Sequence, residues 1–304
     1  MVENRIIVLS GPTASGKTET ALSLARLFPL EIVNADSMQV YRGMDVGTAK
    51  PAPSERAEVP HHLIDVADPD DRYSAGRFVA EAEEAVRGIR ERGRFPLVSG
   101  GTGLYIRSLL RGLDPLPSDP RVRARLVRRW EEEGGGALHR ELSNVDPASA
   151  DLIHSSDKVR VLRALEVAEI TGEPPSARKR SWARGNRYRV LFLVLSVDRA
   201  TLYRRIDSRV DAMFGGGLVE EVKGLLAKGY GRGLPSMGAL GYRHVLAHLL
   251  DGVAREESAF RMKQDTRRYA KRQITWLSGE AGTVRLAGST PREPAAEEVR
   301  KFLF

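Results

Sequence analysis

The stretch that most constrains what this chain can fold into spans residues 11–18 and reads Gly-Pro-Thr-Ala-Ser-Gly-Lys-Thr. An apolar run at residues 5–10 precedes it, and a segment with apolar residues at helical spacing follows at 19–28. Strand, glycine loop, Lys-Thr and helix in this order are typical of a phosphate-binding loop. The glycines let successive backbone N–H groups point inward, and the helix N-terminus adds partial positive charge. The sequence therefore predicts a site for a diphosphate or triphosphate, without indicating which one.

The residues of this loop have separate expected roles. Lys17 brings a full positive charge to the phosphates, and the hydroxyl of Thr18 is placed to ligate Mg²⁺. The alternative, a glycine turn that binds nothing, is disfavoured because the pattern and its context agree. We assign the phosphate site to Gly11, Pro12, Thr13, Ala14, Ser15, Gly16, Lys17 and Thr18.

Composition excludes several classes of protein. The 304 residues include no cysteine, which excludes disulfides, thiolate metal sites and cysteine nucleophiles. No apolar run approaches membrane-spanning length. Residues 1–5 lead directly into the first strand, so no signal peptide is expected. We expect a cytoplasmic protein with no membrane partner.

The charge is unevenly distributed along the chain. Of the net charge of +8, +7 belongs to residues 189–304, which hold 20 basic and 13 acidic residues. A long predicted helix, 256–277, carries six of these cations, with Tyr269 and Trp276 among them. Basic residues interleaved with aromatics suit an RNA backbone and unstacked bases. A solvated basic surface, or an amphipathic helix whose aromatics belong to the core, remains an alternative.

A candidate for chemistry follows the second predicted strand, residues 31–35. In a parallel sheet, strands end at the edge that lines the ligand crevice, so Asp36 is expected beside the phosphate loop. Its alternative role is a helix N-cap. The strand at 95–99 ends in Gly100-Gly101-Thr102-Gly103, where a phosphate-loop NTPase usually has an aspartate that helps to hold Mg²⁺. The machinery for activating water or moving a γ-phosphoryl group is therefore incomplete.

The order of the predicted elements defines the fold class. Apolar strands and helices occupy the first part of the chain, and a strand that suits the centre of a parallel sheet returns after residue 189. Between them lie helical patterns without a convincing strand, ending in the basic linker 178–180, and the last third is predicted to be helical. We expect an α/β fold in which residues 1–112 and 189–304 form a P-loop NTPase-like parallel sheet flanked by helices, and 113–188 form an all-helical insertion domain.

Several stretches together resemble the tRNA dimethylallyltransferase, or tRNA isopentenyltransferase, family in its short bacterial form. The phosphate loop alone is shared by many families. Its combination with the strand end at Asp36 and with the stretch Lys-Arg-Gln-Ile-Thr-Trp-Leu is highly specific. The matching stretches are Gly11–Thr18, Asn34–Tyr41, Gly43–Pro51, Pro60–Asp65, Gly100–Tyr105, Val159–Val167, Gly241–Arg243 and Lys271–Leu277.

The resemblance implies an enzyme that moves a dimethylallyl group from dimethylallyl diphosphate to the exocyclic amine of an adenosine. That adenosine lies next to the anticodon on its 3′ side, in tRNAs that read codons starting with U. The phosphate loop would then hold a diphosphate leaving group, which accounts for the missing acid. A monomer with Mg²⁺ on Thr18 is expected. The catalytic residues are expected to be Asp36, Thr102, Lys17 and Arg209, with Asp36 accepting a proton at an ordinary carboxylate pKa.

The resemblance also implies a tRNA surface. The insertion domain would clamp the anticodon stem-loop while the target base is flipped into a channel. Gln39 and Gln273 suit base edges, and the arginines and Lys271 suit phosphates; the stretch before Gly241 departs from the family pattern because it lacks a basic residue. The residues expected at the tRNA are Asp36, Ser37, Met38, Gln39, Thr102, Arg123, Val159, Arg160, Val161, Leu162, Arg163, Gly241, Tyr242, Arg243, Lys271, Arg272, Gln273 and Trp276.

Two other functions are compatible with parts of the sequence. An ATP-dependent small-molecule or nucleotide kinase shares the phosphate loop, the parallel sheet and a helical lid, but the missing second acid and the basic last third argue against it. A nucleotide-gated RNA-binding protein without chemistry would not explain an aspartate at the phosphate site.

Overall fold

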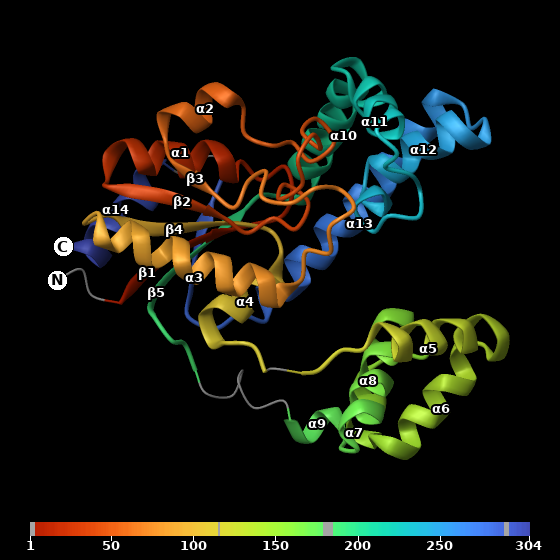
Figure 1. Ribbon diagram of the computed structural model, residues 1–304. Helices are drawn as coiled ribbons and strands as arrows, with labels where there is room; N and C mark the ends of the chain where they lie inside the picture. The colour runs from red at the N-terminus through yellow and green to blue at the C-terminus, as the bar shows by residue number, and fades with distance from the viewer. Residues whose placement is uncertain (1–3, 115, 179–184, 289–291) are drawn as a thin grey trace. The chain divides into compact units, whose positions relative to one another are not determined.

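The computed structural model describes residues 4–114, 116–178, 185–288 and 292–304 (Figure 1). The chain divides into two compact units. Met1–Leu110 and Asn186–Phe304 form the first, called here the core unit, and Arg111–Gly185 form the second, called here the insertion unit. The expected bounds of the insertion were 113 and 188. Part of the predicted basic linker, residues 179 and 180, lies outside the described residues.

A six-stranded parallel sheet lies at the centre of the core unit, with the strand order β3-β2-β4-β1-β5-β6. Because the strands are parallel, the carboxyl ends of β1, β2 and β4 meet at one edge, and the phosphate loop, Asp36 and Thr102 all follow these ends. The predicted α/β class is confirmed. The strands are β1 (Arg5–Ser10), β2 (Leu30–Asn34), β3 (His61–His62), β4 (Phe95–Gly100), β5 (Arg189–Ser196) and β6 (Thr283–Ala287).

Alternating side chains of the strands supply an apolar core on each face of the sheet. Ile7 and Leu9 of β1 pack with α1 (Lys17–Leu27) and α14 (Arg292–Leu303). Ile6 and Val8 point the other way and pack with α3 (Ala75–Glu91) and α4 (Gly103–Arg111). Helices therefore cover both faces, as a buried parallel sheet requires.

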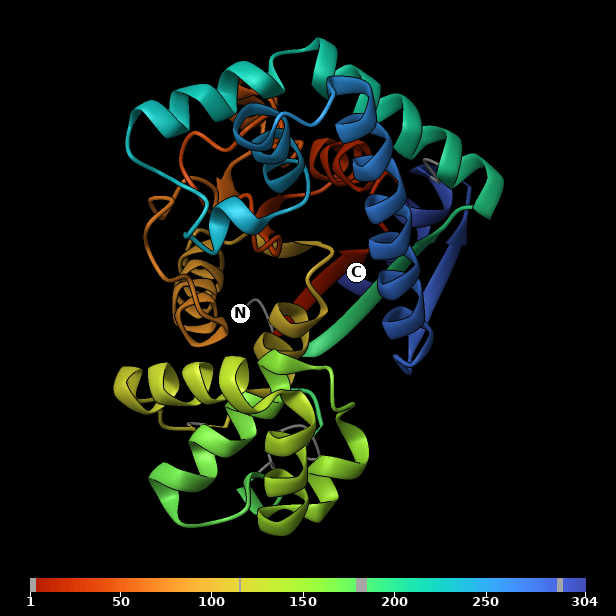
Figure 2. The same cartoon turned by 90° about the vertical axis from the view of Figure 1, so that its right-hand side faces the viewer.

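A third apolar cluster joins the remaining helices of the core unit. It includes side chains of α10 (Arg199–Gly215), α11 (Leu218–Ala227), α12 (Tyr242–Asp251) and α13 (Arg255–Ser278). Both views show α10 and α13 lying side by side (Figures 1 and 2). The short helix α2 (Pro53–Glu58) and a 3₁₀ turn at Ser236–Gly238 complete this unit.

The described part of the insertion unit is helical. Its helices are α5 (Pro120–Glu133), α6 (Gly135–Val145), α7 (Pro147–Leu152), α8 (Lys158–Thr171) and α9 (Pro175–Arg178), and they enclose a small apolar core. Asp119 caps α5 by accepting hydrogen bonds from the backbone N–H groups of Arg121 and Val122.

Two sequence-based predictions about strands are wrong. The last third was predicted to be helical, yet residues 283–287 form β6 and pair with β5. The segment Thr-Val-Arg-Leu-Ala is too short to show a clear alternation of apolar and polar residues. It becomes a strand because the edge of β5 is open for pairing. The sequence also suggests a short strand over residues 60–66, but the strand is limited to β3, because Leu63 and Asp65 adopt positive φ and the chain turns there. No described helix is long and apolar enough to cross a lipid bilayer.

Candidate active site

The phosphate loop connects β1 to α1 and is shaped by left-handed backbone positions. Gly16 has φ of 94° and Ala14 has φ of 63°. Alternation of right-handed and left-handed backbone conformations turns successive N–H groups to one side and forms a concave anion site at the start of a helix. Ala14 lies against Leu202 and Ile206 of α10 and Ala270 of α13, so tertiary packing holds its strained φ.

Lys17 is folded over this loop. Its Nζ donates to the carbonyl oxygens of Gly11 at 2.9 Å and Pro12 at 2.8 Å. The pKa of Lys17 is lowered to about 8, mainly by burial; the charge of Asp36 opposes this decrease, and nearby Arg209 contributes to it. The ammonium group can exchange these carbonyl bonds for bonds to a bound diphosphate.

Asp36 follows β2 and lines both cavities of the site described below. Its Oδ1 accepts a hydrogen bond of 2.9 Å from the backbone N–H of Met38. Burial raises the pKa of Asp36, although the Met38 N–H and the charge of Lys17 oppose the increase. The expectation of an ordinary carboxylate pKa is therefore corrected, because protein surrounds the carboxyl group.

Thr102 supports the segment that carries Asp36. Its Oγ1 accepts from the backbone N–H of Ser37 at 3.0 Å and donates to Ser37 Oγ at 3.3 Å, while its own N–H donates to the carbonyl of Ala35. Thr102 was expected to position either the adenine amine or Asp36. Positioning of Asp36 has direct geometric support, since residues on both sides of Asp36 are held by Thr102.

The glycines around Thr102 allow close packing. A Cβ on Gly100 would lie 2.2 Å from the carbonyl oxygen of Ala35. On Gly101 it would lie 2.2 Å from Nε2 of Gln273, and on Gly103 it would overlap the ring of Trp276. The glycines thus let β4 and the start of α4 approach β2 and α13, which brings elements far apart in sequence to one site.

Two glutamines predicted to read base edges form hydrogen bonds with backbone groups of the protein. Gln273 is 4% exposed; its Oε1 accepts from the N–H of Thr13 at 2.8 Å and its Nε2 donates to the carbonyl of Gly101 at 3.1 Å. Gln39 donates to the carbonyls of Thr48 and Ala49. For buried Gln273 the prediction of base contacts is corrected, because both ends of its amide already bond to backbone; for Gln39, which lines the phosphate cavity, it stays a prediction.

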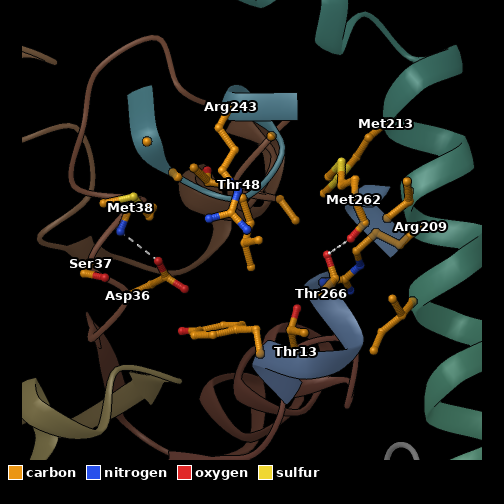
Figure 3. A pocket seen from close by; sticks show the side chains of 18 of the residues that line it. Thr13, Asp36, Ser37, Met38, Thr48, Arg209, Met213, Arg243, Met262 and Thr266 are labelled. Carbon is orange, nitrogen blue, oxygen red and sulfur yellow. Dashed lines mark hydrogen bonds between the residues drawn. The ribbon is translucent and has the colours of Figure 1, made fainter. Parts of the chain in front are cut away.

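Arg209 extends from α10 into the same site (Figure 3). It forms no hydrogen bond or ion pair with another described residue. The surrounding protein and, next, the charge of Arg205 one turn away lower the pKa of Arg209, although an arginine this basic remains charged at neutral pH. An unpaired guanidinium beside the phosphate loop is suited to bidentate contact with a diphosphate.

Two neighbouring cavities form the site. One, of about 270 Å³, follows the phosphate loop from Thr13 to Glu19. The other, of about 310 Å³, lies beside it and has Met213, Met262 and Leu240 on its walls (Figure 3). Asp36, Thr13, Thr48, Ala49, Arg209 and Tyr269 line both cavities. An anion site thus adjoins a partly apolar chamber, with a carboxylate and a guanidinium shared between them.

The residues present fit Mg²⁺ as the metal. Thr18 and Asp36 line a further small cavity as well as the phosphate cavity, so both residues border the space proposed for the phosphates. Among the described residues, no group of three His, Asp or Glu side chains gathers as a metal site. Mg²⁺ needs no such group, because it keeps water ligands and binds through few protein oxygens plus substrate phosphates.

The cations of α13 differ in availability. Lys263 pairs with Asp211, Arg267 with Asp207, and other cations of the helix pair with Glu257 and Asp265. Lys271 and Arg272 are exposed and have no acidic partner among the described residues, and Arg272 lies over the Tyr269 ring. Only part of the predicted basic stripe is therefore free for a polyanion.

Several residues predicted to bind tRNA lie in the core of the insertion unit. Val161 and Leu162 are 0% and 2% exposed and pack inside it. Arg123 and Arg163 both pair with buried Glu166. For the two buried side chains the expectation of RNA contact is corrected, because the unit needs them as core. Val159 is 72% exposed, and the exposed Arg160 pairs with Asp157, so both are accessible.

Burial also decides which of the residues expected at the tRNA are accessible near the start of α12 and the end of α13. Tyr242 is fully buried and its hydroxyl donates to Glu221 at 2.6 Å, so its predicted RNA contact is corrected to a structural role. Gly241 is buried beside it. Arg243 is exposed, pairs with Asp265 and lines the chamber. Trp276 is half-buried and its ring packs near that of Phe192, so only part of the ring is available for contact with RNA.

Among the chamber residues that the sequence did not reveal as part of the site are Met262, Thr266 and Tyr269, the last noted only as an aromatic among the cations. Their signal was present in the sequence. These residues and Gln273 follow one another at spacings of four, three and four, which places them on one face of a helix. Without knowledge of what α13 packs against, that stripe could not be distinguished from an ordinary core face.

The fold and the site together define an α/β phosphate-loop enzyme with an apolar chamber and a second, helical unit. The chain belongs to the IPP transferase family. The model of that family matches residues 39–280, and a model described as isopentenyl transferase matches residues 4–69. The resemblance identified in the sequence is confirmed.

Known proteins resemble the chain over nearly its full length. It is 47% identical to the tRNA dimethylallyltransferase of Desulfosudis oleivorans, covering 98% of this chain and 96% of the relative. A solved tRNA isopentenylpyrophosphate transferase from Bacillus halodurans has a TM-score of 0.73 and 37% identity, covering 99% and 95%. A eukaryotic dimethylallyltransferase acting on tRNA has a TM-score of 0.80 and 28% identity, covering 98% of this chain and 77% of that one.

Proposed function

We propose that this chain transfers a dimethylallyl group from dimethylallyl diphosphate to the exocyclic amine of the adenosine next to the anticodon, on its 3′ side, in tRNAs that read codons starting with U. The observation that carries the proposal is the position of Asp36, which faces both the phosphate cavity and the adjoining chamber. A base at that junction can reach an amine that attacks a carbon still bound to diphosphate.

Departure of the diphosphate requires stabilisation of growing negative charge. Three groups border the phosphate cavity and can stabilise this charge: the N–H groups of the phosphate loop, Lys17 and Arg209. Thr18 would hold Mg²⁺, which when bound offsets charge on the diphosphate oxygens. The C–O bond lengthens, the allylic carbon gains cation character, and the adenine amine forms the new C–N bond as diphosphate leaves.

Removal of a proton completes the reaction. The exocyclic amine is a weak nucleophile because its lone pair is delocalised into the ring, and it becomes acidic only as the C–N bond forms. Asp36 accepts that proton, and its raised pKa makes it a better base than an exposed aspartate. Thr102 keeps the neighbouring Ser37 in place through the hydrogen bonds described above.

Access of the base to the chamber requires that the adenosine leaves its stack, at a cost of a few kcal/mol. Arg272, which lines the chamber, and its neighbour Lys271 have no acidic partner among the described residues and offer contacts to the flanking phosphates. The insertion unit, with Arg160 and Val159 accessible, is proposed to hold the anticodon stem-loop. We expect a monomer that works on tRNA in the cytoplasm.

Mass spectrometry of unmodified tRNA incubated with the protein, dimethylallyl diphosphate and Mg²⁺ tests the proposal. We expect one five-carbon unit to be added to a single adenosine, and release of diphosphate in equal amount. A parallel reaction supplies ATP in place of the prenyl donor. Transfer of phosphate from ATP without prenylation would instead support the kinase alternative, and neither product would contradict both.

A further inference from the structure

One side of the chamber, with Met213 and Met262, has no part in the charge and proton steps above. Figure 3 shows both methionines across the pocket from Asp36. Met213 comes from α10 and Met262 from α13, and they are 9% and 3% exposed. Both belong to the apolar cluster that joins these helices, so the wall they form is backed by core.

The chemistry of this wall suits a hydrocarbon and not a nucleobase. The ring nitrogens of adenine lose hydrogen bonds to water in an apolar site and need replacements. The hydroxyl of Thr266, at this wall, already donates to the carbonyl of Met262 at 2.7 Å. Polar side chains of the chamber, including Thr48, Arg243 and Arg272, offer the base other partners.

Packing also limits how far the wall can retreat. A Cβ on Gly241 would lie 3.1 Å from the terminal methyl of Met262, so this side chain already rests on the backbone of Gly241. Fully buried Tyr242 follows directly and belongs to the same cluster. A longer substrate would therefore have to displace close-packed core.

We propose that Met213 and Met262 set the length of the prenyl chain that the enzyme accepts. The chamber of about 310 Å³ is space for roughly ten water-sized groups at about 30 Å³ each. A five-carbon chain and the reacting edge of adenine use that space, and the additional five carbons of a geranyl chain meet the two methionines. This inference rests on the proposed function, since it concerns the donor of the same reaction.

The test compares dimethylallyl diphosphate with geranyl diphosphate as donors to the same tRNA, using the full chain. Met213→Ala and Met262→Ala remove most of each side chain and should raise the ratio of kcat/KM for geranyl over dimethylallyl diphosphate by about tenfold or more. Met213→Leu and Met262→Leu keep the volume and should leave the ratio near that of the unmodified protein. Thermal unfolding and circular dichroism show whether each variant is folded; Met262→Val, which keeps more core contact, should shift the ratio in the same direction if the alanine variant does not fold.

The possible outcomes are distinguishable. Folded alanine variants with an unchanged donor ratio would overturn the inference and leave the proposed function intact. A higher KM for tRNA with no change in donor preference would also overturn it, because the wall would then face the base. Efficient use of geranyl diphosphate by the unmodified protein would overturn the inference about chain length and keep the proposed function. Absence of any prenyl transfer would overturn both.

Discussion

At the residue scale, the chemistry depends on Asp36 and Lys17, which stand close enough for each charge to affect the pKa of the other. Burial acts on the two groups in opposite directions, since it disfavours the charged form of each. It raises the pKa of the carboxyl group and lowers that of the ammonium group to about 8. The ionised pair that catalysis needs therefore exists over a limited pH range.

Asp36→Asn should slow turnover by at least about a hundredfold while leaving tRNA affinity within about twofold, because an amide cannot accept the amine proton. The amide oxygen can still accept the Met38 N–H, so the local turn is preserved. Single-turnover rates and tRNA binding measured on the same preparation test this. Turnover within tenfold of the unmodified protein would remove Asp36 from the role of base.

The pH dependence of kcat/KM for dimethylallyl diphosphate should be bell-shaped. Asp36 acts as the ionised carboxylate, so activity is lost as the pH falls through its raised pKa. Lys17 binds diphosphate as the ammonium, so activity is lost as the pH rises through about 8. In Lys17→Arg the alkaline loss should disappear, because a guanidinium stays charged. An alkaline limb that persists in this variant would assign it to another group.

At the element scale, α13 connects several parts of the site. It carries the wall residues Met262 and Tyr269, the amide of Gln273 that binds both the phosphate loop and the end of β4, and the free cations Lys271 and Arg272. The sequence left open whether this helix binds RNA or places its aromatic side chains in the core. The structure shows that its buried face organises the catalytic loops, while one exposed segment keeps its charge.

Lys271→Ala combined with Arg272→Ala should weaken tRNA binding and flatten its dependence on salt, by a slope of about one for each lost phosphate contact. The matched control is Arg300→Ala with Lys301→Ala, which removes the same number of charges from α14. Binding titrations at several salt concentrations distinguish the two. Equal slopes for the two double variants would place the RNA footprint elsewhere.

Gly100→Ala should destabilise the core unit by about 1–3 kcal/mol, since its Cβ would meet the backbone of Ala35 and force β2 and β4 apart. Gly224→Ala is the control, because nothing lies within 4 Å of its Cβ and alanine favours α11 by about 1 kcal/mol. Urea unfolding gives both values. A Gly100→Ala protein as stable as the original would contradict the close approach.

At the scale of the whole molecule, the chain forms two compact units. The core unit contains the cavities of the site, and the insertion unit has an apolar core of its own. In the insertion unit, Glu166 is 1% exposed and pairs with Arg123 and Arg163. These arginines were predicted to meet RNA phosphates. Their first task is to neutralise a carboxylate that joins α5 to α8.

Glu166→Ala should destabilise the insertion unit by about 1–3 kcal/mol, less than a fully buried pair because both arginines are about one-third exposed. Hydrogen exchange should quicken in residues 120–171 and stay unchanged in the sheet of the core unit. Prenyl transfer at saturating tRNA should be retained if the active site is complete in the core unit. Uniformly faster exchange in both units would show that they unfold together.

Much of the fold and part of the site could be predicted from local sequence. The phosphate loop, Asp36 and the insertion were identified because turn chemistry, strand ends and helical periods are short-range signals. β6 was missed because its pairing with β5 is decided by tertiary contact. Gln273 and Tyr242 were assigned to the tRNA by family resemblance, and sequence alone does not show which polar groups are already bonded inside the protein.

By itself, the sequence determined the anion cradle and the aspartate beside it. A glycine loop before a helix forms an anion site, and residues that directly follow parallel strands lie at the same edge of the sheet. Only the tertiary structure decided which charges are free, how burial shifts the pKa values of Asp36 and Lys17, and where the apolar chamber lies. These properties depend on α10 and α13, whose residues are more than 150 positions beyond Asp36 and meet it only when the chain has folded.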